Sequence, residues 1–308
     1  MLHIRNLILF LFLLLACSCK REEVRGQHEN PATSIKAVDI SAYNLTDQET
    51  LSLYDSAGQI LDVYDKLLQN GFNTIRLRLW HSPQNGEPYD LKRIAQRAKF
   101  LKNRGFSIWL CPHYSDIWAD PGHQTLPAAW QGLSYELLKD SLRVYTEKIV
   151  LAIEPDIIQL GNEINNGWLH PFGSWTGQKG PELLTIASRA VRTEAPSTTI
   201  MVHHAGLTGF KYFREEFLAN LDYDLLGISY YPWWHGKELE AFHDSLMVWQ
   251  QRIAKPVMIA ETAYPFTLEW NDWTNNIVGL DEQLILPEYP ATIEGQRKFI
   301  NQIKKLTK

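Results

Sequence analysis

The sequence has 308 residues, of which 45% are hydrophobic and 21% are charged, so it is an ordinary globular chain, long enough for one large domain or two modest ones. Its formal net charge is −5 and it contains no basic stripe, which argues against a nucleic-acid partner. Aromatic residues make up 12% of the chain, including 11 tryptophans, and many of the tryptophans follow strand-like segments. Tryptophan in such loops suits stacking against sugar rings, although large aromatic residues also cover the core of many domains.

The N-terminus has the pattern of a processing signal. Leu7–Leu15 is an apolar run too short to span a bilayer as a helix, and Leu14–Cys17 looks like a lipobox, the cleavage site of bacterial lipoproteins. Residues 1–19 are therefore expected to be a lipoprotein signal peptide and lipobox. A plain secretory signal cleaved near Ala16 is the alternative.

If the lipobox is used, Cys17 becomes the lipidated residue that anchors the chain to a membrane. Residues 20–34 are polar and lack periodicity, so we expect them to form a flexible tether. Only Cys111 then remains in the folded part, as a small buried hydrophobic residue, and no disulfide framework is implied.

From residue 35 onward, strand-like and helix-like segments alternate. The predicted strands are Ala37–Tyr43, Asn73–Trp80, Ser107–Tyr114, Ile157–Glu163, Thr199–His204, Leu225–Tyr231 and Pro256–Ala263. The predicted helices include Asp55–Asn70, Leu91–Arg104, Tyr135–Ile153, Pro181–Glu194 and Ile293–Leu306. Gly71 and Gly105 follow two of these helices as stop signals.

This alternation predicts a parallel sheet with right-handed crossovers. Seven strands over this length favour a (β/α)₈ barrel over an open sheet, whose ligand site would usually carry a glycine-rich phosphate loop that this sequence lacks. No eighth strand follows Glu261 in the sequence. We therefore expect residues 35–308 to form one barrel domain that is C-terminally incomplete, lacking its eighth βα unit.

Two of the predicted strands end on a glutamate, Glu163 on the fourth and Glu261 on the seventh. A carboxylate at the end of an apolar strand is costly to bury unless it is paired or used. Each could form a structural ion pair, but barrel enzymes keep their chemistry at these strand ends, and a pair of carboxylates is what glycoside hydrolysis requires. Arg76 and Arg78 alternate onto one face of the second strand, the barrel interior, where they could hold a glutamate ionised.

The segment around Asn162-Glu163, with a second glutamate closing strand seven, resembles the clan of retaining (β/α)₈ glycosidases. Within that clan the sequence resembles the arabinogalactan endo-β-1,4-galactanases, glycoside hydrolase family 53. The motifs that carry this resemblance occur in the family's order: Asn73–Trp80, His113–Trp130, Gly161–Leu169, Ile228–Trp234 and Ile259–Phe266.

The resemblance implies a role for each of these residues. Glu163 would be the acid/base, Glu261 the nucleophile, and Asn162 would bind the 2-hydroxyl of the sugar. Arg76 matches the clan's arginine. Tyr231 would donate a hydrogen bond to the nucleophile, with the adjacent tyrosine at position 230 left open by strand parity alone.

Further residues would line the substrate subsites through hydrogen bonds and stacking: Arg78, His113, Asp116, Trp118 and His203. A zinc site built from His113, Asp116, His123 and His203 is the alternative, but their spacing matches no metal motif. Some bacterial relatives hold calcium after strand seven, where this chain has Leu268–Asn276, a segment poor in acidic residues. We therefore expect no metal in the site and no cofactor, with a structural calcium left open.

The implied function is retaining, endo-acting hydrolysis of β-1,4-galactosidic bonds in pectic galactan, or type I arabinogalactan. The chain is expected to be a monomer, anchored by its lipid to the bacterial outer membrane or cell surface. Two alternatives remain at this stage: another glycanase of the clan, acting on xylan, mannan or cellulose, and a non-catalytic surface lipoprotein that binds glycans.

Overall fold

The computed structural model describes residues 35–41, 43, 53–54, 57–84, 86–174, 176–269 and 277–307. The chain divides into two units, Met1–Ile35 and Lys36–Lys308, and the fold described here is that of the second. The predicted signal peptide and tether lie outside the described residues.

The second unit is built on a parallel sheet of seven strands in the order β1-β4-β5-β6-β9-β10-β11. These strands are β1 (Ala37–Asp39), β4 (Thr74–Leu79), β5 (Ser107–Pro112), β6 (Ile157–Gln159), β9 (Thr199–Ala205), β10 (Leu225–Ser229) and β11 (Val257–Glu261). The strands of this sheet lie side by side in the order in which they occur along the chain, and the hairpin strands β2–β3 and β7–β8 belong to separate sheets. Among the described residues, no further strand pairs with β1 or β11.

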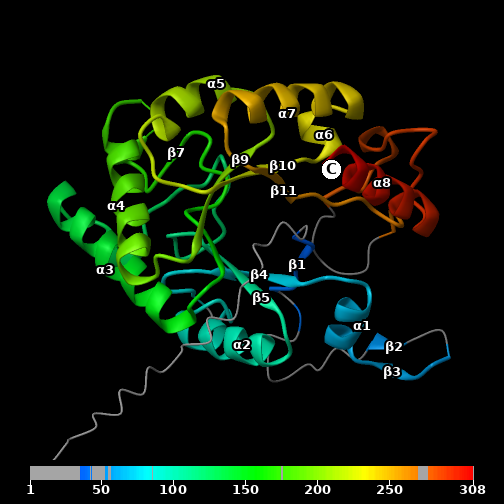
Figure 1. The fold of residues 1–308 in the computed structure, drawn as a ribbon, viewed down its shortest axis with the longest axis horizontal. Coiled ribbons are helices and arrows are strands. Elements are labelled where there is room, and N and C mark those ends of the chain that lie inside the picture. The colour runs from blue at the N-terminus through cyan, green and yellow to red at the C-terminus, as the bar shows by residue number, and fades with distance from the viewer. Residues whose placement is uncertain are drawn as a thin grey trace, which may run out of the picture. The chain divides into compact units, whose positions relative to one another are not determined.

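Helices alternate with these strands, and Figure 1 shows them around the outside of the sheet. They are α1 (Val63–Gln69), α2 (Leu91–Asn103), α3 (Tyr135–Ile153), α4 (Lys179–Glu194), α5 (Phe210–Phe213), α6 (Pro232–His235), α7 (Leu239–Ile253) and α8 (Ile293–Leu306). Short helical turns occur at η1 (Ala128–Trp130), η2 (Arg214–Leu218, a π-helix) and η3 (Asp281–Gln283). The predicted barrel-type fold, with seven parallel strands and outer helices, is confirmed.

Glycine ends α1 and α2 in the way the sequence predicts. Gly71 and Gly105 adopt the left-handed conformation, with φ of 77° and 93°. Their N–H groups donate to Leu68 O and Lys102 O, and the residue after each glycine donates to the carbonyl one residue earlier, Leu67 O or Leu101 O, which is the Schellman arrangement. Glycine is suited to this conformation because it has no Cβ to clash.

Two helices differ from the sequence prediction. The predicted helix at residues 55–70 begins only at Val63, because Asp62 caps it by accepting from the N–H groups of Tyr64 and Asp65. The helix α7 was not among those predicted. It ends on Ala254 in the left-handed conformation, so it lacks the glycine stop signal that marked α1 and α2. Two short hairpins, β2–β3 (Leu53–Tyr54 and Ile60–Leu61) and β7–β8 (Gly167–Trp168 and Gly173–Ser174), were also not predicted.

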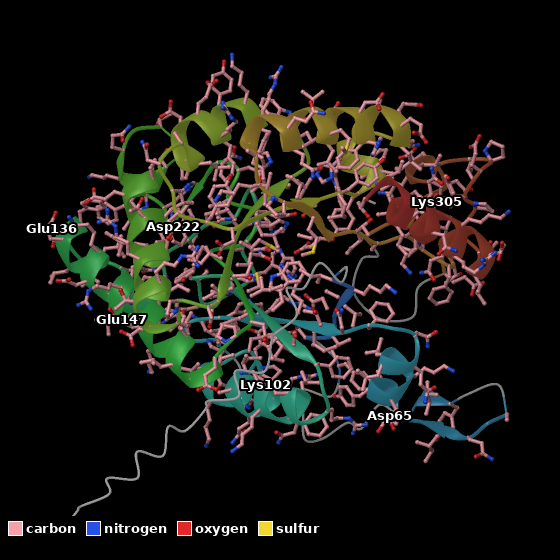
Figure 2. The ribbon with its side chains drawn as sticks, viewed as in Figure 1. Asp65, Lys102, Glu136, Glu147, Asp222 and Lys305 are labelled. Carbon is pink, nitrogen blue, oxygen red and sulfur yellow. The ribbon has the colours of Figure 1, made fainter. Side chains whose placement is uncertain are left out.

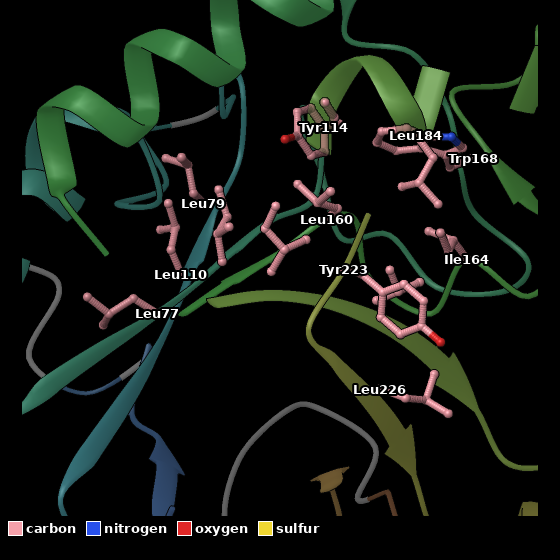
Figure 3. Close-up of a cluster of buried hydrophobic side chains, with 14 of the residues drawn as sticks. Leu77, Leu79, Leu110, Tyr114, Leu160, Ile164, Trp168, Leu184, Tyr223 and Leu226 are labelled. Carbon is pink, nitrogen blue, oxygen red and sulfur yellow. The ribbon is translucent and has the colours of Figure 1, made fainter. Parts of the chain in front are cut away.

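The core lies between the sheet and the helices. Ile75, Leu77 and Leu79 of β4 are fully buried and belong to one hydrophobic cluster with residues of α2, α3 and α4. Figure 3 shows part of it, where Leu77 of β4 lies beside Leu110, its partner on β5. Because side chains alternate along a strand, burial of these three against the helices places Arg76 and Arg78 on the opposite face, inside the sheet's curve.

The outer helices carry the charged surface, and Figure 2 shows Asp65, Glu136 and Lys305 among the side chains on them. In the part of the chain that the structure describes, no helix combines the length and apolar character needed to cross a membrane.

Candidate active site

The carboxyl ends of β4, β6, β9, β10 and β11 bring together a buried set of polar side chains. Glu163 follows β6 and has a φ of 49°, in the left-handed region that residues other than glycine seldom adopt. Such a conformation costs about 1–3 kcal/mol and persists only where the surroundings fix it, which is typical of functional sites. Glu261 is the last residue of β11.

An arginine holds Glu261. Arg76 Nη2 lies 2.6 Å from Glu261 Oε1, and Arg76 itself is only 2% exposed. This contact is an ion pair without hydrogen-bond geometry, so Oε1 is held by charge. The other carboxylate oxygen accepts a hydrogen bond of 3.1 Å from Tyr231 Oη. Glu261 is thus held by one cation and one hydroxyl donor.

The same arginine also pairs with Asp39, at the end of β1. Arg76 Nη1 donates to Asp39 Oδ2 at 2.8 Å. Burial by itself would raise the pKa of Asp39, but Arg76 and Arg78 outweigh it and lower that pKa. Arg78 lies 3.4 Å from the same carboxylate, and its guanidinium is over the rings of both Tyr89 and Trp118. Arg78 therefore pairs with Asp39 and the aromatic rings.

The second glutamate has an opposite environment. Glu163 is 8% exposed, and burial raises its pKa to about 7, with the negative charge of Glu261 adding to the effect. Its Oε1 accepts a hydrogen bond of 2.5 Å from Ser229 Oγ, which limits this rise. Burial therefore favours the protonated form of Glu163 near neutral pH, as a catalytic acid requires.

Residues at the end of β10 lie beside both glutamates. Ser229 is the register partner of Glu261, and its hydroxyl bonds to Glu163. Of the two adjacent tyrosines, Tyr231 contacts Glu261, whereas Tyr230 is fully buried and donates to Gly236 O at 2.7 Å. The geometry therefore selects Tyr231, which strand parity alone had left open.

Asn162 is fully buried and engaged with the protein. Its Oδ1 accepts from Arg76 Nη2 at 2.8 Å, and its Nδ2 donates to Ala119 O at 2.9 Å. One amide hydrogen is left for a further acceptor. Cys111 is also buried, but its surroundings are polar: Arg76 Nη2 lies 3.3 Å from Sγ, and burial raises the pKa of the thiol to about 12.

His203 lies beneath Glu163 and is fully buried. Its Nδ1 is 2.8 Å from Gln159 Nε2 and 3.3 Å from the backbone N of Glu163, and its Nε2 is 2.9 Å from Ser229 Oγ. Burial holds the pKa of His203 well below its usual value, so the ring is neutral. Both ring nitrogens have protein partners, which makes His203 a support for Glu163.

His113 has a free donor. Its Nδ1 accepts from the backbone N–H of Ala119 at 2.9 Å, which leaves the proton on Nε2. Nε2 is buried and has no hydrogen-bond partner among the described residues. Burial holds the pKa of His113 well below 6.5, so the ring is neutral. Trp118, which is 38% exposed, packs edge-on against this ring at 5.2 Å.

Asp116 anchors two loops. Its carboxylate accepts from the backbone N of Ser82 at 2.9 Å and from that of Ala128 at 2.8 Å. Asp116 is 7% exposed and both oxygens are occupied. The structure therefore places it as a loop tether rather than at an open surface.

The four residues of the alternative zinc site do not lie together. His123 is an exposed partner of Asp120, whereas His113 and His203 bond elsewhere in the site. Within the described ranges, no three His, Cys, Asp or Glu side chains are arranged to hold a metal ion. Most of the loop considered for calcium, residues 270–276, lies outside the described residues.

A cavity of about 340 Å³ lies on the helix side of β9, where His204 packs against Phe210 and Phe213 of α5. It begins at Asn165, two residues beyond Glu163, and reaches His204 at the end of β9. Its other walls are formed mainly by α5 and η2. Neither glutamate lines it.

Three site residues were missed by sequence reasoning: Asp39, Gln159 and Ser229. Asp39 and Ser229 end strands, as the two glutamates do, and Ser229 shares the strand parity of Tyr231. Those signals were present in the sequence. Gln159 carries no comparable signal, because a glutamine inside an apolar run gives no indication of its partners.

Comparison with known proteins places this geometry in context. A model of glycosyl hydrolase family 53 matches residues 35–308. An arabinogalactan endo-β-1,4-galactanase of Cellvibrio japonicus is 33% identical over 277 residues, which cover 83% of this chain and 72% of that protein.

Solved structures agree. The family 53 catalytic domain of Ignisphaera aggregans is similar with a TM-score of 0.83 at 34% identity, covering 88% of this chain and 80% of that one. A fungal β-1,4-galactanase structure gives a TM-score of 0.77 at 27% identity, covering 89% and 85%.

Proposed function

The chain belongs to glycosyl hydrolase family 53, and from this membership we infer that it is an endo-acting β-1,4-galactanase that hydrolyses galactan. The observation that carries this function to the site is the opposed pair of carboxyl groups: Glu261 is ion-paired to Arg76, and Glu163 is buried with a pKa of about 7. The resemblance seen in the sequence is thereby confirmed at the level of the family.

We propose that the reaction proceeds with retention through Glu261 as nucleophile. In the first step Glu261 attacks the anomeric carbon, and Glu163 gives its proton to the glycosidic oxygen, which leaves with the departing chain. Glu163 then removes a proton from water, and the resulting hydroxide displaces Glu261 from the sugar. The first step begins with Glu163 protonated, the form that its burial favours, and the second begins with Glu163 deprotonated after it has given up that proton.

We propose that the substrate passes beside the remaining predicted residues. His113 Nε2–H supplies an unused donor, Trp118 a partly exposed aromatic face, and Asn162 one unused amide hydrogen. Arg78, stacked on Trp118, would hold that ring in place. Asp116 and His203 would act indirectly, by holding the loops and the acid/base. Both chemical steps use only carboxyl groups and water, so the proposed mechanism includes no cofactor.

We further propose that the enzyme acts as a monomer on pectic galactan outside the cell, anchored through Cys17. The lipobox pattern of Leu14–Cys17 supports this, as does the size of a polymeric substrate that would be met at the cell surface.

The test is chromatography of products released from linear β-1,4-galactan, with xylan, mannan and cellulose as comparison substrates. We expect short galacto-oligosaccharides from galactan and little release from the others. Release from one of the other glycans instead would assign the enzyme to another substrate. Binding to galactan without new reducing ends would favour a non-catalytic binding protein.

A further inference from the structure

We propose that Ser229 positions the Glu163 acid/base, and that Ser229 is itself oriented by a one-way chain of hydrogen bonds that starts at Arg76. The proposal deepens the proposed function and rests on it, since it assumes that Glu163 is the acid/base. The chain runs from Arg76 through Gln159, His203 and Ser229 to Glu163.

The first link is fixed because arginine can only donate. Arg76 Nε and Nη2 lie 3.4 and 3.3 Å from Gln159 Oε1, so that atom is an acceptor and the amide group is oriented. Gln159 Nε2 lies 2.8 Å from His203 Nδ1, 2.9 Å from Asn162 Oδ1 and 3.0 Å from Gly161 O, so its two hydrogens are shared among three acceptors. Because an amide nitrogen can only donate, His203 Nδ1 cannot donate to it.

A second obligate donor confirms the direction at His203. The backbone N–H of Glu163 points at His203 Nδ1 at 3.3 Å, so two donors converge on this nitrogen. Asn162 Oδ1 lies 3.1 Å from the same atom, but its two lone pairs already accept from Arg76 Nη2 and Gln159 Nε2. A neutral ring with Nδ1 as acceptor carries its proton on Nε2. Nε2–H therefore donates to Ser229 Oγ.

Ser229 has one hydroxyl hydrogen, and its direction follows. Because His203 donates to Ser229 Oγ, the serine hydroxyl is free to donate to Glu163 Oε1, at 2.5 Å. Oε1 is thus occupied as an acceptor in both protonation states of Glu163. The acidic proton is left to Oε2, which becomes the oxygen that protonates the leaving group. Gln159, His203 and Ser229 are all fully buried, so water does not compete for these bonds.

The chain also links the two glutamates, because Arg76 pairs directly with Glu261. Other titratable or charged groups contribute to the field at Glu163, and they come from several elements: Glu261, Arg76, Asp120, His203 and Tyr231. Among its hydrogen bonds, the one from Ser229 lowers the pKa of Glu163. Loss of the Ser229 hydrogen bond should therefore raise the pKa of Glu163 and allow its proton to occupy either carboxyl oxygen.

The experiment compares wild-type enzyme with Ser229→Ala on two substrates. On linear galactan we expect kcat to fall roughly tenfold to a hundredfold with little change in KM, since this substrate needs protonation by Glu163. The alkaline limb of the pH profile should move up by about one unit. On an aryl β-galactobioside with a good leaving group, formation of the glycosyl-enzyme should change less than about threefold.

Ser188→Ala is the matched control. Ser188 is a buried serine of α4 that donates to Asp222 O at 2.5 Å, outside the chain from Arg76 to Glu163. The Ser188→Ala variant should have the same pH profile as the wild-type enzyme. An equal loss on both substrates with an unmoved alkaline limb would mean that Ser229 has only a structural role and would overturn the proposal.

Failure of the wild-type enzyme to cleave galactan would refute the proposed function itself. Normal wild-type cleavage with unchanged kinetics in Ser229→Ala would refute only the role of Ser229. These two failures are distinct.

The direction of the chain can be read in the wild-type protein without any variant at Ser229. Nitrogen-15 NMR of the histidine rings should show His203 neutral, with the proton on Nε2, from about pH 5 to 8. The His203 signal is identified by its loss in His203→Gln. A proton on Nδ1, or a ring that becomes charged in this range, would break the chain and overturn the proposal.

Discussion

Glu163 and Glu261 follow similar apolar strands, and their different surroundings divide the chemistry between them. Arg76 and Tyr231 contact the carboxylate of Glu261, whereas burial raises the pKa of Glu163. At the residue scale, this asymmetry is what the proposed mechanism needs, because a nucleophile must be ionised while the general acid must hold a proton.

Removing each carboxyl group should have a different effect on an activated substrate. Glu163→Ala should lose most activity on galactan, by roughly 10²–10⁴-fold, yet still form a glycosyl-enzyme from an aryl β-galactobioside whose leaving group needs no proton. Glu261→Ala should form none from either substrate. Rapid-quench kinetics of aryl release measures this, and equal rates for the two variants would contradict the assignment of roles.

The pH profile should report the state of Glu163. Burial and Glu261 raise its pKa to about 7, and only the protonated form can serve as the acid. Activity should therefore fall as pH rises through about 7. Glu163→Gln, assayed on galactan through its residual activity, should lose this alkaline limb, as measured by the rate of hydrolysis against pH. Retention of the limb in that variant would assign it to another group.

The sequence predicted which residues lie in the site more successfully than it predicted the hydrogen-bond partners of each residue. The positions of Arg76, Asn162, Glu163, Tyr231 and Glu261 follow from strand ends and alternation, which the sequence displays. The roles of His203 and Asp116 do not, because their partners come from segments distant in sequence. Asp116 bonds to Ser82 and Ala128 across loops, and loop paths leave no periodic signal.

At the scale of elements, the close approach of β9, β10 and β11 fixes the site. Gly227 lies in the middle of β10, and a Cβ added there would come 2.8 Å from Met201 Sδ and 2.9 Å from Ala260 Cβ, with His203 Cδ2 at 3.4 Å. Glycine allows these strands to pair while keeping room for the buried histidine beneath Glu163.

Gly227→Ala should therefore destabilise the protein by about 1–3 kcal/mol through overpacking. Chemical denaturation of the purified protein measures the change. Gly122→Ala is the control, because its added Cβ would meet only the Asp120 side chain, at 3.3 Å, and should stay within about 0.5 kcal/mol of wild type. Equal stability of the two variants would show that the strands adjust freely.

Element boundaries were predictable where a local signal exists. The ends of α1 and α2 carry glycines, and both helices end there. The start of α1 was misplaced because the amphipathic pattern extends upstream of the Asp62 cap. The helix α7 was not predicted, and it ends on a left-handed alanine instead of a glycine stop signal.

At the scale of the whole molecule, the catalytic unit and the N-terminal signal are inferred from separate observations. The family match begins at residue 35, where the predicted tether ends. If Leu14–Cys17 is a lipobox, wild-type protein should partition with membranes after cell fractionation, because several acyl chains hold a protein stably. Cys17→Ala should be released or left unprocessed. Membrane retention in that variant would point to another anchor.

The central claim is that this chain hydrolyses β-1,4-galactan with retention. Proton NMR of linear galactan during the first minutes of hydrolysis tests substrate and stereochemistry in one measurement. With retention, we expect new reducing-end galactose signals that appear first as the β anomer and only later equilibrate with the α anomer by mutarotation. Initial appearance of the α anomer would contradict the assignment of Glu261 as nucleophile, and the absence of new reducing ends would contradict the proposed function.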